Sequence, residues 1–273
     1  MELNQRLLRS LWKRSDRIRL NSNYGFTKFM CRAVSKVVRY LWKNLSFSAP
    51  NFAPSLLGPY LKVRSEDFTF QFCRMGYCGV FLSDELEEIS ESTVFLDVGA
   101  NIGLFTILAS RNKNFVSSYA FEPDYHTLPY LKNNIEFNNS KNVIVFPFAI
   151  SDQTGELSMK VFKNHSGGSS LSSVLKEDEL ITIQCVDQEF LNNSCVIPQE
   201  ASVFVKIDVE GHEFQVLKSI FVSQIGHKVS RIFLEFDVNT PNIDRVEKIL
   251  KEHGFAEKKR DGTVEHWDAL WIR

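Results

Sequence analysis

The sequence has no C-x-x-C motif and no long apolar run. Its 273 residues include five cysteines, an odd number scattered without a C-x-x-C pair. Such spacing favours neither a disulfide framework nor a zinc site. A membrane span needs a run of about 18 apolar residues, which is absent, and no apolar segment follows a basic start as in a secretory signal. We therefore expect a cytoplasmic protein with free thiols.

The charge is small in total but unevenly distributed. Residues 1–43 hold eleven Lys and Arg against two acids, a net +9, and the total of −1 leaves −10 for the remainder. This division indicates an N-terminal arm that meets an anionic partner. A membrane surface, an anionic polymer and the acidic body of the chain itself all remain open as that partner.

Residues 24–45 have the apolar spacing of one helical face, with basic residues opposite. Such a helix can lie in a membrane interface, which would place the protein peripherally at the inner membrane face. The alternative is that this face packs on the body or on a second subunit of a homo-oligomer. The apolar positions are Phe26, Phe29, Met30, Ala33, Val34, Val37, Val38, Leu41, Trp42 and Leu45.

Proline and glycine between Ser46 and Tyr60 predict a linker, so we divide the chain into an arm and linker at 1–60 and a catalytic domain at 61–273. After the linker, Phe68–Phe72 alternates like a strand and Glu85–Ser90 is typical of a short acidic helix. From Val94 onward strands and helices alternate, which predicts an α/β fold with a doubly wound, mostly parallel sheet.

The individual elements can be placed by residue. A hairpin insertion is expected from Glu156–Phe162 and Leu180–Cys185, with a flexible run at Ser166–Ser173 between its arms. The other expected elements are strands Val94–Val98, Ser118–Phe121, Val143–Phe148, Val203–Ile207 and Arg231–Phe236, helices Ile102–Ser110, Leu128–Phe137, Glu213–Ile220 and Ile243–His253, and closing strands near Ala256–Lys259 and Ala269–Ile272.

The first motif, VFLDVGANIG, is a strand that ends in Asp97 followed by a turn between Gly99 and Gly103. Ligands of open α/β sheets bind beyond the carboxyl ends of the strands, so this turn is a candidate cofactor site. Nicotinamide dinucleotides favour G-x-G-x-x-G around their pyrophosphate, whereas here the spacing is G-x-x-x-G and a carboxylate precedes it. A carboxylate would repel pyrophosphate but suits the ammonium and sulfonium of S-adenosyl-L-methionine (SAM).

Two further segments extend this candidate cofactor site. Glu122 follows the second strand, where a carboxylate can accept hydrogen bonds from both hydroxyls of a ribose. The segment FAISD follows the third strand and should line the adenine end through the backbone at Ala149. Asp152 can accept from the exocyclic amine, or alternatively cap the turn toward Gly155.

The second motif, KIDVEGHE, places Lys206, Asp208 and Glu210 on one side of a strand. Buried charges are costly unless they pair or serve a site. Methyl transfer to a hydroxyl needs a base, a role that His212 or Asp208 can fill. Asp208 and Glu210 can alternatively hold a divalent cation such as magnesium. Glu235 ends the next strand and would face the same crevice or pair with Lys206.

The motifs DVGANIG, FEP, AISD, KIDVEGHE and FLEF together resemble the FkbM-type methyltransferases, over roughly residues 65–255. The resemblance implies a class I, Rossmann-like, SAM-dependent fold and O-methylation, often of a sugar hydroxyl. It implies SAM binding by Asp97, Gly99, Asn101 and Glu122, and an acceptor side formed by Lys206, Asp208, Glu210 and His212. Pro129 departs from an unbroken helix after FEP and is expected to shorten that helix by a turn.

The expected acceptor is a carbohydrate or small molecule, and no motif typical of nucleic-acid binding is present. A bacterial glycan on a lipid carrier would suit the basic arm. The alternatives are a lipid, small-molecule or protein acceptor for the same enzyme, and a SAM-fold module that binds a partner without turnover. An intact set of Asp97, Glu122 and the KIDVEGHE charges favours catalysis.

Overall fold

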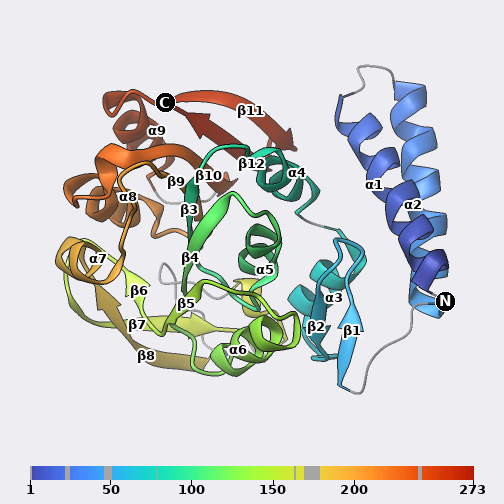
Figure 1. Cartoon of the computed structure of the whole chain (residues 1–273), viewed down its shortest axis with the longest axis horizontal. Helices are drawn as coiled ribbons and strands as arrows, with labels where there is room; N and C mark the ends of the chain where they lie inside the picture. The colour runs from blue at the N-terminus through green and yellow to red at the C-terminus, as the bar shows by residue number, and fades with distance from the viewer. Residues whose placement is uncertain are drawn as a thin grey trace.

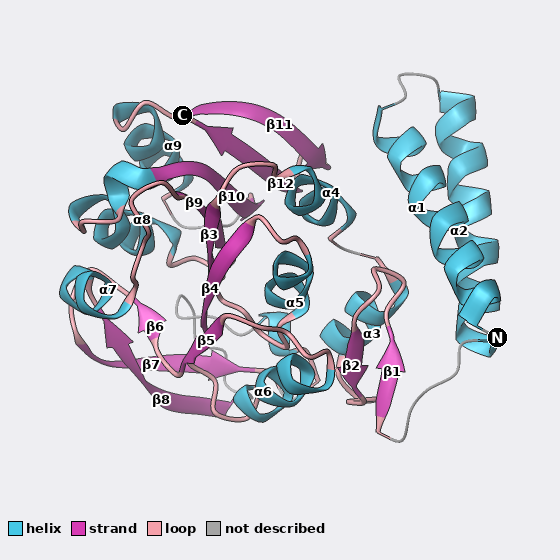
Figure 2. Ribbon diagram, viewed as in Figure 1, coloured by secondary structure: helices cyan, strands magenta, loops and turns pink. Residues whose placement is uncertain are grey.

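The computed structural model describes residues 2–21, 25–45, 51–77, 79–162, 164–168, 179–238 and 242–273. Helices cover a central twisted sheet, and a smaller sheet and a helical pair lie at its sides (Figures 1 and 2). The described helices are α1 Glu2–Asn21, α2 Gly25–Leu45, α3 Phe68–Met75, α4 Val80–Glu88, α5 Leu104–Arg111, α6 Leu128–Phe137, α7 Gln188–Ser194, α8 Glu213–Val222 and α9 Ile243–Glu252, with 3₁₀ turns η1 Ser166–Gly168 and η2 Gly226–Lys228.

The described strands are β1 Phe52–Pro54, β2 Tyr60–Lys62, β3 Thr93–Val98, β4 Phe115–Phe121, β5 Val143–Phe146, β6 Ala149–Ile150, β7 Gly155–Val161, β8 Glu179–Val186, β9 Ser202–Ile207, β10 Val229–Asp237, β11 Ala256–Gly262 and β12 His266–Ile272. Seven of them form the central sheet in the order β11-β12-β10-β9-β3-β4-β5. Strands β10, β9, β3, β4 and β5 run parallel to one another. Strand β12 pairs antiparallel with β10, and β11 pairs antiparallel with β12. The predicted doubly wound, mostly parallel α/β sheet is confirmed.

The middle strand β3 is apolar because both faces of the sheet are covered. All of its residues are buried. Val94 and Leu96 face a core that includes side chains of α7, α8 and α9, whereas Phe95 faces a second core with side chains of α4 and α5. Strand order reverses between β3 and β9, so the crevice at their carboxyl ends is the natural ligand site of this topology.

The insertion between β5 and β9 forms a second sheet of order β6-β8-β7. Strands β7 and β8 pair antiparallel from Gly155 opposite Cys185 to Val161 opposite Glu179, so the predicted hairpin is confirmed. Of the run Ser166–Ser173 between its arms, the structure places Ser166–Gly168 in η1, and residues 169–173 lie outside the described residues.

One predicted strand is wrong. Residues 68–72 belong to helix α3, because Asp67 caps its N-terminus by accepting from the amide of Thr69 at 3.0 Å and Gly76 ends it at a φ of 60°. The alternation of phenylalanine with polar residues therefore predicted a strand where the backbone is helical. Helices α1 and α7 were not predicted at all. Pro129 lies in the first turn of α6, where a missing amide costs nothing, so α6 keeps the full predicted span Leu128–Phe137.

Helices α1 and α2 lie side by side at the edge of the molecule (Figure 1). The predicted helix over 24–45 corresponds to α2. Trp12 and Trp42 are buried in the same core as Phe95 of the central sheet. The division at residues 60 and 61 stays a prediction, and those two residues lie together in β2, which pairs with β1. The part of the linker at 46–50 lies outside the described residues.

Candidate functional site

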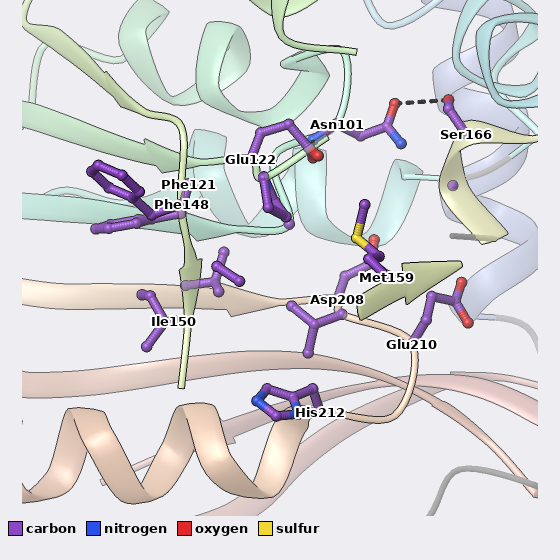
Figure 3. A pocket seen from close by; sticks show the side chains of 16 residues that line it. Asn101, Phe121, Glu122, Phe148, Ile150, Met159, Ser166, Asp208, Glu210 and His212 are labelled. Carbon is purple, nitrogen blue, oxygen red and sulfur yellow. Dashed lines mark hydrogen bonds between the residues drawn. The ribbon is translucent and has the colours of Figure 1, made fainter. Parts of the chain in front are cut away.

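A cavity opens at the carboxyl ends of β3, β4 and β9, at the point where the strand order reverses (Figure 3). Residues from six separate segments of the sequence meet there, as expected for a ligand site of an open α/β sheet. Its lining consists of Val98, Gly99, Asn101, Phe121, Glu122, Pro123, Phe148, Ala149, Ile150, Met159, Ser166, Gly167, Asp208, Val209, Glu210 and His212.

The turn after β3 requires glycine at two positions because of its backbone angles and the atoms packed against it. Gly99 has a φ of 76°, and a Cβ there would lie 1.9 Å from the carbonyl oxygen of Asp208. Gly103 has a φ of 83°, and a Cβ there would lie 2.5 Å from Leu131. Both positions therefore demand glycine. Gly99 lines the cavity, whereas Gly103 is absent from its lining and instead lets α5 approach α6.

Glu122 is a buried carboxylate that faces the cavity (Figure 3). Its Oε2 accepts from the amide of Asn101 at 2.8 Å, and its Oε1 accepts from the amide of Asp124 at 2.9 Å. Burial raises the pKa of Glu122 to about 7, although both amides oppose the shift. Each carboxylate oxygen can accept a second hydrogen bond, so Glu122 retains capacity for two ligand hydroxyls.

Asp97 and Lys206 form a buried ion pair beneath the turn. Asp97 is 0% exposed, and Lys206 Nζ lies 3.5 Å from its Oδ1. The other oxygen of Asp97 accepts from the hydroxyl of Thr106 at 2.5 Å. Lys206 also donates to the carbonyl of Gly99 at 2.6 Å, so this pair fixes the turn from below. Neither residue belongs to the cavity lining, and direct contact of Asp97 with a cofactor stays a prediction.

Asp208 connects this pair to the cavity. Its Oδ2 lies 3.1 Å from Lys206 Nζ, and its side chain is part of the lining. Burial alone would lower the pKa of Lys206, but Asp208 and Asp97 outweigh it and hold the lysine charged. Burial raises the pKa of Asp208 to about 6, against the effect of Lys206. Asp208 is therefore ionised at neutral pH.

His212 and Ser151 meet at the other side of the cavity. His212 Nε2 lies 2.9 Å from Ser151 Oγ, and burial lowers the pKa of His212, so the imidazole is neutral at neutral pH. His212 precedes α8 and makes no side-chain cap of that helix. Ser151 follows β6 and was not singled out by the sequence, although it lies within the FAISD segment that was. A neutral imidazole held by a hydroxyl is suited to accept a proton.

Two predicted site residues make their contacts elsewhere. Asp152 lies 2.9 Å from Lys218 and is absent from the lining, so the structure does not bring it to the adenine end, while its neighbour Ala149 lines the cavity. Glu235 lies 2.9 Å from His266 Nε2 instead of pairing with Lys206. That hydrogen bond raises the pKa of His266 to about 9.

Ser166 and Gly167 of η1 line the cavity but were not predicted from the sequence as site residues. Ser166 Oγ donates to Asp67 Oδ2 at 2.7 Å and lies 3.2 Å from Asn101 Oδ1. The amide of Gly167 donates to Thr69 Oγ1 at 2.7 Å. The cap of α3 therefore anchors this loop over the turn. A serine- and glycine-rich run carries no signal of such an anchor, because it depends on the distant Asp67.

No group of three or more His, Cys, Asp or Glu side chains within the described ranges is arranged to hold a metal ion. Asp208 is instead engaged by Lys206. The structure thus gives no support to the divalent cation considered for Asp208 and Glu210. Glu210 lines the cavity at a φ of 53°.

Solved methyltransferases are similar to this chain at low identity. Precorrin-6y C5,15-methyltransferase from Geobacter metallireducens is 12% identical with a TM-score of 0.43 over 71% of this chain and 86% of that chain. The M. jannaschii TYW2 structure in complex with AdoMet is 15% identical with a TM-score of 0.41, over 83% of this chain and 89% of that chain.

Sequence relatives are more informative. Hexuronic acid methyltransferase AglP of Haloferax volcanii is 32% identical over 167 residues, which cover 61% of this chain and 65% of AglP. Methyltransferase 1 of Beauveria bassiana is 25% identical over 66% of this chain and 62% of its own length. The matched regions thus span just under two thirds of these two relatives.

A sequence profile of the methyltransferase FkbM domain matches residues 97–256, more than half of the chain. The resemblance of the sequence motifs is confirmed: the chain belongs to the FkbM methyltransferase family.

Proposed function

We propose that this methyltransferase uses SAM and transfers the methyl group to a hydroxyl of a sugar. The observation that carries the proposal is the cavity itself, which joins Glu122 at one end to Asp208 and His212 at the other. One end has the groups that recognise an adenosine, and the other has a base and a carboxylate for the acceptor. Membership of the FkbM family gives methyl transfer as the reaction class. The cavity gives the relative positions of the residues that would bind the cofactor and the acceptor.

The residues of the cavity fit SAM in charge and shape. Glu122 has one free acceptor position on each oxygen for the two ribose hydroxyls. Phe148, Ala149 and Ile150 supply an apolar wall for the adenine ring. Asp208 places a carboxylate at the far end, which suits a ligand with an ammonium and a sulfonium. Glu210 beside it holds its proton at neutral pH, because burial and the neighbouring Asp208 raise its pKa to about 8. When bound there, SAM supplies an electrophilic methyl group.

His212 is the group best placed to take the proton of the acceptor hydroxyl. Its imidazole is neutral, because burial lowers its pKa, and Ser151 holds Nε2. In the tautomer whose Nε2–H donates to Ser151 Oγ, Nδ1 is the unprotonated nitrogen. It has no hydrogen bond to a described residue and can accept the proton as the new carbon–oxygen bond forms. Asp208 is the second candidate base, but its ion pair with Lys206 reduces its basicity. We therefore assign proton transfer to His212 and orientation of the acceptor to Asp208.

A sugar acceptor is supported by the relative from Haloferax volcanii, whose name gives a hexuronic acid as its substrate. The carboxylate of Asp208 implies that the acceptor presents a hydroxyl to this end of the cavity and keeps any carboxylate of its own away from it. Lipids, other small molecules and proteins are the competing acceptors.

The test uses SAM with a radiolabelled methyl group and separate panels of glycans, lipids and proteins. Label transferred to a glycan by the parent and lost in His212→Ala supports the proposal. Transfer only to a lipid or a protein would keep the enzyme and overturn the sugar acceptor. An exposed histidine variant, His227→Ala, is the matched control and should transfer as the parent does.

A further inference from the structure

Helix α2 has two apolar faces, of which only one is covered. Cys31, Val38 and Trp42 point inward and are buried. On the opposite side, Phe26 is 76% exposed and Tyr40 is 69% exposed. At about 100° per residue these two fall on one row with three further exposed side chains. This row, the outer face of α2, consists of Phe26, Phe29, Met30, Val37 and Tyr40.

A row of exposed cations borders the outer face. Arg32, Lys36 and Lys43 lie along α2 beside it. Together with Arg6 and Arg14 of α1, they make no ion pair with any residue that the structure describes. Other cations of the helical pair are engaged: Lys13 lies 3.4 Å from Asp84, for example. Three cations of α2 without an ion pair to a described residue therefore border the outer face.

The helical pair is attached to the body by its inner side, which fixes the direction of the outer face. Arg39 donates to the carbonyl of Met75 at 2.9 Å and to that of Gly76 at 2.8 Å. Trp42 Nε1 donates to the carbonyl of Pro54 at 3.1 Å. Arg17 donates to both oxygens of Asp84, at 2.7 and 2.8 Å. Figure 1 shows the pair standing along one edge of the molecule.

We propose that the outer face of α2 docks on the surface of an anionic lipid bilayer. Phenylalanine, methionine and valine side chains gain by entering the acyl boundary, and the bordering cations gain by contact with anionic head groups. A second copy at this face would bring two positively charged helical pairs together. A nucleic acid or other polyanion would satisfy the cations but leave Phe26 and Phe29 in water. No helix of the described chain is long and apolar enough to cross a bilayer, so the contact lies in the interface plane.

The test is co-sedimentation of the full chain with vesicles of phosphatidylcholine alone and of phosphatidylcholine mixed equally with phosphatidylglycerol. The parent should sediment with the anionic vesicles only, and less so as salt rises. An apolar variant, Phe29→Ser with Val37→Ser, and a charge variant, Lys36→Gln with Lys43→Gln, should each weaken partitioning at least about tenfold. The matched controls Val222→Ser with Val264→Ser and Lys141→Gln with Lys258→Gln alter exposed residues elsewhere and should partition as the parent does.

Circular dichroism melting confirms that each variant is folded before sedimentation. Failure of the parent to sediment with anionic vesicles would overturn the proposal, as would unchanged partitioning of both outer-face variants. A parent that is dimeric in analytical ultracentrifugation and becomes monomeric with Phe29→Ser and Val37→Ser, without binding vesicles, would assign the outer face to a second copy instead.

Discussion

His212 Nε2 lies 2.9 Å from Ser151 Oγ, which joins the start of α8 to the end of β6 across the cavity. The contact fixes the plane of the imidazole before any acceptor arrives. Burial lowers the pKa of His212, so the neutral form that can accept a proton predominates at neutral pH. Position and protonation state thus both suit a base.

We expect His212→Ala to reduce kcat by about 10²- to 10⁴-fold, the usual contribution of a general base, while cofactor affinity stays near that of the parent. Ser151→Ala should have a smaller effect, because it frees the ring without removing it. The rate of the parent should fall as pH drops below the pKa of the imidazole, which lies under 6.5. Initial rates across pH check both points, and a parental kcat in His212→Ala would remove this residue from the mechanism.

Lys206→Met leaves the carboxylate of Asp97 buried without its cation, since Asp97 is 0% exposed. Such a change costs about 3–5 kcal/mol in the free energy of unfolding. Asp97→Asn in the same chain removes the stranded charge, so the double variant should be more stable than Lys206→Met alone. Urea unfolding of the parent, both single variants and the double variant measures this coupling. Equal losses for Lys206→Met and the double variant would contradict the ion pair.

Glu122 makes stability depend on pH. Its pKa rises from an ordinary 4.5 to about 7 on folding, so the folded state holds the proton longer than the unfolded state. Stability therefore falls as pH rises from 4.5 to 7, by up to roughly 3 kcal/mol for a shift of this size. Glu122→Gln removes the ionisation and should flatten this slope. Unfolding midpoints in urea at several pH values provide the measurement, and parallel curves for parent and variant would rule out Glu122 as the source.

The positions of the central strands along the chain, though not their order in the sheet, were predictable because buried parallel strands are continuous apolar runs. The segments VFLDVG and VFVKID show this plainly. The same runs located Glu122, Asp208 and His212, which follow strand ends. The cavity thus assembles from signals that are local in the chain.

Other features depend on partners far away in the sequence. Direct contact of Asp97 with a cofactor stays a prediction, and the observed ion-pair partner of Asp97 is Lys206, over a hundred residues later in the chain. Asp152 forms an ion pair with Lys218. Ser166 donates a hydrogen bond to Asp67, the N-cap residue of α3. Residues 68–72 alternate in polarity, yet they are helical because Asp67 caps the N-terminus of α3. Tertiary contacts of this kind override local pattern.

Trp12 is the main apolar attachment of the helical pair and is completely buried. A Cβ at Gly76 would lie 2.3 Å from its ring, so the indole rests directly on the end of α3. Trp12→Ala should cost about 3–5 kcal/mol through lost contact and cavity formation. Thermal unfolding followed by limited proteolysis checks it, with early cleavage within α1 and α2 expected. Leu11→Ala, at an exposed neighbour, should melt and resist cleavage as the parent does.

The cavity between Glu122 and His212 is proposed to bind SAM. The most direct measurement is isothermal titration of the full chain with S-adenosylhomocysteine, the product that SAM leaves. The parent should bind, Glu122→Ala should bind at least about tenfold more weakly because two ligand hydrogen bonds are lost, and the exposed control Glu136→Ala should match the parent. No binding by the folded parent, or parental affinity in Glu122→Ala, would contradict the account.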